Sequence, residues 1–254
     1  MRVFAISDLH SDFAENWKTL QQLSQQDYQN DVVLIAGDIA DNLLVIARTL
    51  SHMRARFSQV FYVPGNHELW TRREGCYSID KLDRILQLCD GLGVCAKPAR
   101  AGELWVVPLL SWYEAAFDET QSACGEELEG WADNYFCKWP PWINSVAEYF
   151  LSANVPNIKS YDGPVITLSH FLPRRDLLPE VARLKFKGLP RVAGCAALDQ
   201  QIRAVDSVLH IFGHSHIRCD RLIDGVRYVQ SVLGYPSEKN TLDESLKLIW
   251  SSQT

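Results

Sequence analysis

The sequence of 254 residues has no apolar run that approaches the roughly 18 residues a membrane-spanning helix requires. Its first ten residues, MRVFAISDLH, become polar too early for the apolar region of a signal peptide. No two of its seven cysteines form a C-x-x-C pair, and their odd number favours free thiols in a reducing compartment. We therefore expect a cytoplasmic protein without a membrane partner.

The sequence also lacks an excess of basic residues. Its net charge is -6, whereas a chain that neutralises several phosphates of a nucleic acid is usually basic, so an extended nucleic acid is not the expected partner. Residues 101–137 contain no Lys or Arg but eight acidic residues. This stretch is interpreted either as a solvated acidic face or as a lid that repels polyanions.

The first third of the chain alternates between two hydrophobic periods. Short apolar runs over 2–7, 31–38 and 59–68 predict buried strands, and the spacing of apolar residues over 13–26 and 42–57 predicts helices. Strands that alternate with helices in this way predict a parallel sheet and an α/β fold.

The rest of the chain predicts an insertion and a second sheet. Residues 111–161 are irregular and rich in tryptophan and acidic residues, and we interpret them as an inserted cap within a single domain over 1–254. Runs at 163–171 and 207–216 predict strands that end in histidine. The runs GVRYVQ and LKLIW predict further strands of the second sheet, with IDG as the turn of a hairpin.

Polar side chains with metal-binding chemistry follow five of these strands. Because sites in open α/β sheets form at the carboxyl ends of strands, these side chains are predicted to meet. Oxygen and nitrogen ligands without a thiolate suit Mn, Fe, Zn or Mg, and their number exceeds what one ion needs, so two divalent ions are expected. The residues are Asp8, His10, Asp38, Asn66, His67, His170, His214 and His216.

Five motifs in this order resemble those of the calcineurin-like metallophosphoesterase superfamily. They are D-x-H at 8–10, G-D-x-x-D at 37–41, G-N-H-E at 65–68, a single histidine at 170 and G-H-x-H at 213–216. The resemblance implies a four-layer α/β/β/α sandwich of two mixed sheets.

The resemblance also implies a role for each motif residue. Asp8, His10 and His216 would hold one metal ion. Asn66, His170 and His214 would hold the second, and Asp38 would bridge both. A hydroxide shared by the ions would attack phosphorus directly, with His67 as the general acid and Asp41 orienting the imidazole of His67.

One departure concerns the phosphate-binding cation. Phosphoprotein phosphatases of the superfamily continue G-D-x-x-D with Arg-Gly, but here Asn42 and Leu43 follow. This argues against that branch. The pairs Arg72–Arg73 and Arg174–Arg175 follow motif residues closely and are candidates for binding substrate, although exposed arginines that pack along their stems are more typical.

The expected activity is hydrolysis of a small phosphorylated molecule by a dinuclear metal-dependent phosphoesterase. The alternatives are a phosphodiesterase acting on a cyclic nucleotide or other diester, and a scaffold that binds metal without catalysis. Removal of about 114–135 is expected to relax substrate choice more than it weakens metal binding. The residues leave the oligomeric state and the identity of the metals open.

Overall fold

The computed structural model describes residues 1–72, 74–118 and 128–252. Its strands form two sheets, which are both mixed. The first sheet has the order β10 (Lys247–Ser251), β1 (Arg2–Ile6), β2 (Val32–Ala36), β3 (Gln59–Val63). The second has the order β4 (Ala99–Ala101), β5 (Leu104–Pro108), β6 (Val165–Leu168), β7 (Ser207–Phe212), β9 (Val226–Gln230), β8 (Cys219–Ile223).

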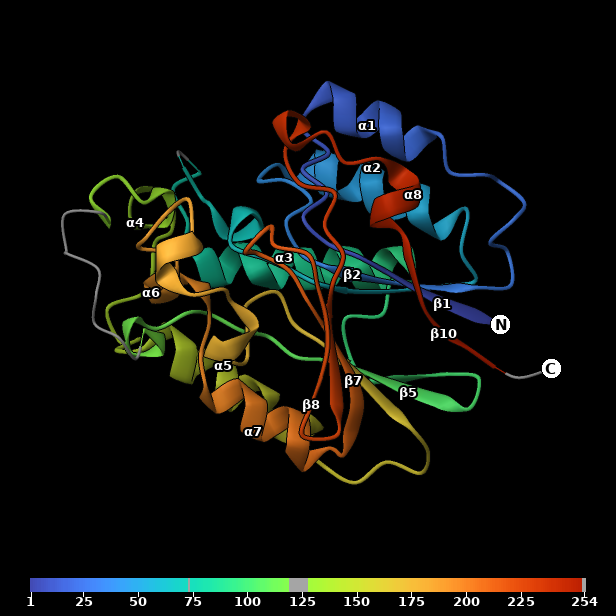
Figure 1. Cartoon of the computed structure of the whole chain (residues 1–254). Helices are drawn as coiled ribbons and strands as arrows, with labels where there is room; N and C mark the ends of the chain where they lie inside the picture. Colours follow the sequence, from blue (N-terminus) through green and yellow to red (C-terminus); the bar gives the residue numbers. More distant parts are fainter. Residues whose placement is uncertain (73, 119–127, 253–254) are drawn as a thin grey trace.

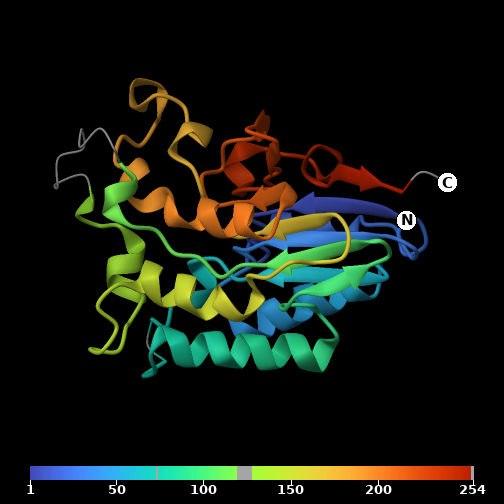
Figure 2. The same cartoon turned by 90° about the horizontal axis from the view of Figure 1, so that it is seen from below.

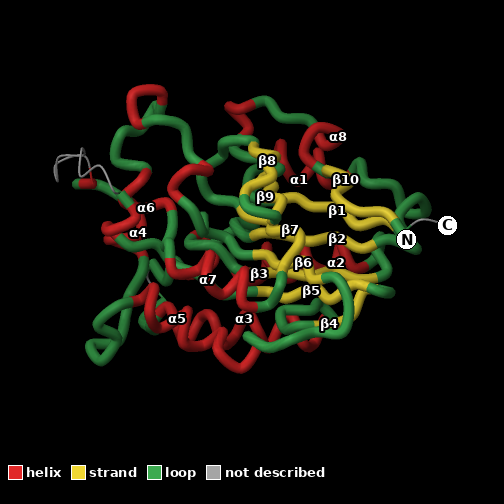
Figure 3. Tube along the Cα trace, turned by 60° about the horizontal axis from the view of Figure 1, so that its bottom comes forward, coloured by secondary structure: helices red, strands yellow, loops and turns green. Residues whose placement is uncertain are grey.

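Helices cover the outer faces of the sheets (Figure 1 and Figure 3). The α-helices are α1 (Ala14–Gln21), α2 (Leu43–Arg54), α3 (Ser78–Leu92), α4 (Ala132–Phe136), α5 (Val146–Asn154), α6 (Pro190–Ala193), α7 (Ala197–Ala204) and α8 (Leu242–Ser245). Short 3₁₀ helices include η1 (His67–Leu69), η2 (Ala115–Phe117), η4 (Val155–Asn157), η5 (Arg175–Leu177), η6 (Val181–Arg183) and η7 (Pro236–Glu238).

Successive side chains along each strand point to opposite faces of its sheet, and this creates three hydrophobic layers. One lies between the two sheets, and one lies on the outer face of each sheet. In β2, Val32 and Leu34 pack between the two sheets, while Val33 and Ile35 pack beneath α1, α2 and α3. This follows from the period of two in a strand, which sends successive side chains to opposite faces. On the second sheet, outward residues such as Phe212 pack against α7. The predicted α/β fold with two mixed sheets is confirmed, and the layers run helix, sheet, sheet, helix.

Two predictions about the last strands have different outcomes. The hairpin is confirmed, because β8 and β9 are antiparallel and joined by Asp224 and Gly225, which both have positive φ as a tight hairpin turn requires. The placement of LKLIW in the second sheet is wrong. This segment is β10, which pairs antiparallel with β1 in the first sheet. The hairpin already fills that edge of the second sheet, whereas β1 would otherwise leave an unpaired edge in the first.

The 111–161 segment lies away from the chain termini. Figures 1 and 2 show α4 and the neighbouring α6 at the opposite side of the molecule from the N- and C-terminal ends. Within the segment the described residues form η2, α4, α5 and η4, and part of the acidic stretch, 119–127, lies outside the described residues. No helix in the described ranges is long and apolar enough to cross a membrane.

Candidate metal centre

The strand ends bring the predicted ligands together at one edge of the two sheets. Asp8 and His10 follow β1, Asp38 follows β2, and Asn66 begins the turn after β3. Residues from the ends of β6 and β7 join them from the second sheet. Three groups have potential ligand atoms within 4.8 Å of one another: Asp8, His10 and His216; His10, Asp38 and His67; and Asp38, His170 and His214.

The backbone at these ligands adopts an uncommon conformation. Positive φ occurs at Asp8, His10, Asp38, His214 and His216, with values between 40° and 70°. Non-glycine residues in this region are uncommon, although Asp and His are enriched there. Each such residue costs about 1–3 kcal/mol and persists because its surroundings hold it, as is frequent at functional sites. The turns after β1, β2 and β7 are therefore locally less stable than regular turns, and their conformation directs these side chains into the site.

Backbone and carboxylate partners fix the direction of two imidazoles. His170 donates from Nδ1 to the carbonyl of Ala36 at 2.8 Å, so its Nε2 is the ring nitrogen that faces Asp38 Oδ1, at 3.4 Å. His216 donates from Nδ1 to Glu238 Oε1 at 2.7 Å. Its Nε2 then faces Asp8 Oδ1 at 3.5 Å. This is the arrangement that orients metal-ligating histidines in proteins.

The donor set fits divalent cations. Among the described residues, His214 Nε2 is buried without a hydrogen-bond partner. The Nε2 atoms of His10 and His216 lie 3.2 Å apart. Burial lowers the pKa of His10 and of His214 to about 3, which leaves both imidazoles neutral with lone pairs available. Lone pairs that converge on carboxylates in a buried space are satisfied by cations with oxygen and nitrogen ligands.

Glycines allow the two sheets to approach closely at the site. Gly37 has φ +78°, and a Cβ there would lie 2.5 Å from His170 Nδ1. A Cβ on Gly65 would overlap Asp38 Oδ1 and lie 2.7 Å from His170 Nε2. Only a residue without a side chain leaves room for both ligands at these turns.

Replacing Gly65 with alanine is therefore expected to destabilise the protein and to weaken its binding of Mn²⁺. Overpacking typically costs about 1–3 kcal/mol, and thermal unfolding with and without Mn²⁺ measures both effects. Gly91→Ala in α3 is the matched control, because no atom lies within 4 Å of the added Cβ. Unchanged stability and unchanged Mn²⁺ affinity in Gly65→Ala would contradict this description of the turn.

Glu68 organises the backbone beneath the site. Its carboxylate accepts hydrogen bonds from the backbone N–H groups of Asp38, Ile39 and Gly65 at 3.0, 2.6 and 2.8 Å. Burial and the charge of Asp38 raise the pKa of Glu68 to about 7, although the backbone donors oppose this shift. The last residue of G-N-H-E thus joins the turn after β2 to the turn after β3.

His67 lies at the wall of the site rather than at its buried centre. Its ring packs on Trp70 with centroids 3.8 Å apart, and its Nε2 lies 3.9 Å from Asp38 Oδ2. The hydroxyl of Tyr235 lies 3.4 Å from the same Nε2. Neither Trp70 nor Tyr235 is part of a motif in the sequence, so their place beside His67 is found only in the structure.

The structure places Asp41 beside Arg72 rather than beside His67. Asp41 forms an ion pair with Arg72, and no hydrogen bond or ion pair to His67 is found in the described part of the chain. The guanidinium of Arg72 lies over the ring of Phe136 at 4.5 Å, which holds it near Asp41. A full positive charge on a nearby exposed side chain satisfies the Asp41 carboxylate in place of an imidazole.

The other predicted arginines also lie elsewhere. Arg174 pairs with Asp176, Asp199 and Asp224. Arg175 donates to the carbonyl of Pro179 at 3.4 Å, and Arg73 lies outside the described residues. The three described arginines of these pairs are not among the residues that line the cavity at the site. These arginines lie close to a motif in the sequence, but their long side chains point to partners away from the cavity.

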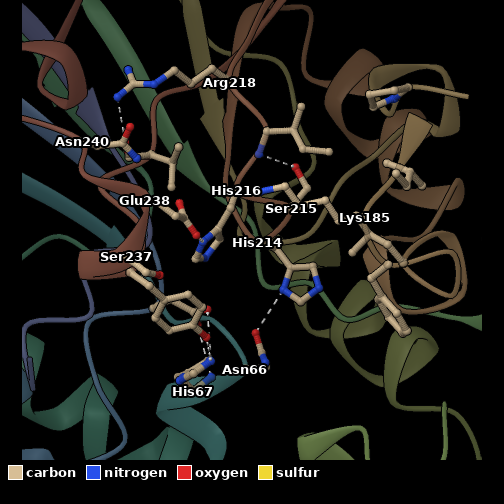
Figure 4. A pocket seen from close by; sticks show the side chains of 18 of the residues that line it. Asn66, His67, Lys185, His214, Ser215, His216, Arg218, Ser237, Glu238 and Asn240 are labelled. Carbon is tan, nitrogen blue, oxygen red and sulfur yellow. Dashed lines mark hydrogen bonds and ion pairs between the residues drawn. The ribbon is translucent and has the colours of Figure 1, made fainter. Parts of the chain in front are cut away.

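A cavity of about 1120 Å³ opens from the site. Figure 4 shows His214 facing Asn66, with Glu238 beside His216 and Lys185 on the far side of His214. The cations that line the cavity are Arg183, Lys185 and Arg218. Arg218 donates to the carbonyls of Glu244 and Val232. Arg183 and Lys185 are exposed, and no sequence motif indicates either of them.

The fold and the site agree with comparisons to known proteins. The model of the calcineurin-like phosphoesterase family matches residues 1–218. The chain belongs to this family, and the predicted class of phosphoric ester hydrolase is confirmed.

Among individual proteins, it is similar to acyl-carrier-protein phosphodiesterase PptH of Mycobacterium tuberculosis, with 27% identity over 260 residues that cover 93% of this chain and 78% of the relative. The crystal structure of phosphopantetheinyl hydrolase (PptH) from the same organism has a TM-score of 0.81 at 24% identity. The match covers 99% of this chain and 96% of that one, and this likeness supports the fold.

Proposed function

We propose that this chain is a metal-dependent phosphodiesterase that hydrolyses the phosphopantetheinyl diester of an acyl carrier protein. The sequence predicted a small phosphorylated molecule as the whole substrate, whereas in this proposal only the phosphopantetheine arm of a larger substrate enters the cavity. The carrier protein stays outside. Of the alternatives that the sequence left open, the diester is the one this proposal selects.

Two divalent ions are part of the proposal. Asp8, His10 and His216 hold one of them. Asn66, His170 and His214 hold the other, and the carboxylate of Asp38 lies in ligand groups on both sides. Such ions lower the pKa of bound water and neutralise charge that develops on phosphoryl oxygens. The chain itself orients the ligands through Ala36 and Glu238 and holds the His67 ring against Trp70.

The cavity is the observation that carries this proposal. Its volume of about 1120 Å³ exceeds the range of about 300–1,000 Å³ that is typical of small-molecule sites. The apolar side chains of Trp131, Leu184 and Phe186 line it together with the predicted ligands and form its apolar wall. A phosphate at the ligands therefore leaves room for a long, partly apolar arm. A compact monoester would leave most of this wall without contact.

Charge and similarity support the same substrate. Arg183 and Lys185 supply positive charge at the cavity in a chain with a net charge of -6, and an anionic diester complements it. The relative with 27% identity is named as a phosphodiesterase of acyl carrier protein. Its alignment extends over 93% of this chain.

The test uses metal-stripped protein refilled with Mn²⁺. We expect it to convert a carrier protein that bears phosphopantetheine into the unmodified carrier, detected as a loss of mass by mass spectrometry. We also expect it to hydrolyse bis-p-nitrophenyl phosphate faster than p-nitrophenyl phosphate.

Three other results are informative. An unchanged carrier with preferred hydrolysis of p-nitrophenyl phosphate would indicate a phosphatase of small monoesters. Hydrolysis of bis-p-nitrophenyl phosphate with an unchanged carrier would indicate a different diester. Two bound ions without turnover of any substrate would indicate a scaffold.

A further inference from the structure

A buried carboxylate from the 111–161 segment contacts a predicted metal ligand. Asp133 in α4 is 2% exposed, and its Oδ1 accepts a hydrogen bond of 2.9 Å from Asn66 Nδ2. We propose that Asp133 is a positioning residue that sets the orientation of the Asn66 amide, and that the second metal position is incomplete without it. This inference rests on the proposed two-ion site.

The chemistry of the two groups makes the orientation unambiguous. The Asp133 carboxylate accepts N–H groups from Asn66, Trp70 and Trp131, whereas an amide has a donating end and an accepting end. Asp133 therefore selects the orientation in which Asn66 Nδ2 points toward α4. The opposite end, Oδ1, then faces His170 Nε2 and His214 Nδ1, each at 3.2 Å. A reversed amide would direct N–H groups at the same imidazoles and offer no lone pair to a cation.

Two indoles hold the carboxylate in place. Trp70 donates from Nε1 to Asp133 Oδ1 at 2.6 Å, and Trp131 donates from Nε1 to Oδ2 at 2.9 Å. Both oxygens thus have fixed partners, and the carboxylate has no freedom to turn away from Asn66. Buried networks in which every member has a partner define a single geometry.

The same network reaches the wall of the cavity. Trp131 stacks on Phe186 with centroids 5.7 Å apart and approaches the ring of His214 edge-on at 6.1 Å. Tyr113 supplies a further oxygen 3.1 Å from Trp131 Nε1. The 111–161 segment therefore contributes to metal binding as well as to the cavity. On this inference, removal of 114–135 weakens metal binding as well as changing substrate choice, whereas the sequence predicted mainly a change in substrate choice.

The experiment measures binding of Mn²⁺ by titration calorimetry and the electron paramagnetic resonance of the loaded protein. Wild type is expected to bind two ions and to give the signal of a spin-coupled pair. Asp133→Ala is expected to bind the second ion 10–100 times more weakly, as loss of an outer-shell partner does. At limiting Mn²⁺ this variant gives the signal of isolated ions.

A second substitution separates orientation from packing. In the Asp133→Ala background, Asn66→Asp places a carboxylate at the ligand position, and its two oxygens are equivalent, so no partner is needed to orient it. We expect the double variant to recover the second ion to within about threefold of wild type, an interaction that a double-mutant cycle isolates. Asp31→Ala, which removes a buried carboxylate that binds Arg2, is the control and should leave both ions bound.

Each other outcome has a distinct meaning. If Asp133→Ala binds both ions like wild type, or if the double variant recovers nothing, the positioning role is wrong. If wild type binds fewer than two ions, the two-ion site is wrong and this inference falls with it. If Asp133→Ala does not fold, Asp133→Leu, which retains the side-chain volume, replaces it with the same expected results.

Discussion

Replacing Asp38 with asparagine is expected to remove both metal ions and with them the activity. Asp38 is 2% exposed and belongs to two of the three ligand groups. Burial raises the pKa of its carboxyl, but the neighbouring His170 and His67 outweigh burial, so the pKa stays well below its ordinary value. The variant loses this negative charge and places an amide N–H₂ donor where a carboxylate oxygen would bind a cation.

The expected loss of Mn²⁺ affinity in Asp38→Asn is at least about 100-fold, the upper end of the loss measured for outer-shell partners. Titration calorimetry and metal analysis of the purified variant measure it directly. Asp31→Asn is the matched control, since Asp31 is also buried but precedes β2, whereas Asp38 follows it, and its partner is Arg2. Full metal content and full activity in Asp38→Asn would show that the two-ion assignment is wrong.

The second large effect is expected for His67→Ala. The His67 ring lines the cavity and packs on Trp70, but the buried ligands do not depend on it for their hydrogen bonds to Ala36 and Glu238. We therefore expect the variant to retain its metal ions and to lose about 10²–10⁴-fold in kcat for alkyl esters, which need a proton on the leaving oxygen.

The leaving group distinguishes a general acid from other roles. Esters of p-nitrophenol leave readily without a proton, so their turnover by His67→Ala should fall much less than that of alkyl esters. Steady-state kinetics on a matched series of diesters supply the comparison. His52→Ala is the control, because His52 in α2 contacts the carbonyl of Leu20 at 2.9 Å. An equal loss across the series would assign His67 to binding of phosphoryl oxygens.

Local patterns in the sequence were sufficient to predict which side chains meet. Each ligand follows an apolar run, and parallel strands in one sheet end at one edge, so Asp8, Asp38 and Asn66 had to approach each other once the runs were recognised. The partner of a strand is a different matter. β10 pairs with β1 across almost the whole chain, and nothing in LKLIW itself distinguishes an edge of one sheet from an edge of the other.

The residues that orient the ligands were harder to find from the sequence. Glu238 lies 22 residues after His216, and Asp133 lies 67 residues after Asn66, with no motif to relate either pair. The positions of the candidate substrate-binding arginines were hard to predict for a related reason. A long side chain reaches many partners, and Arg72 and Arg174 meet carboxylates that only the folded chain brings near. Strand periodicity in the sequence therefore indicates which residues could bind the metal ions. The residues that hydrogen-bond to those ligands are known only from the tertiary structure.

The positive φ angles at five predicted ligand positions bear on how metal binding affects the stability and the degradation of the protein. A chain that holds the backbone of these residues in a left-handed conformation before a cation binds has less conformational entropy to lose on binding. The same cation stabilises only the folded chain, because the unfolded chain cannot present this arrangement. If the proposed ions bind, metal supply would set the fraction of molecules that unfold and are degraded by proteases. Scarcity of the ion would then shorten the half-life of the protein as well as reduce its catalytic activity.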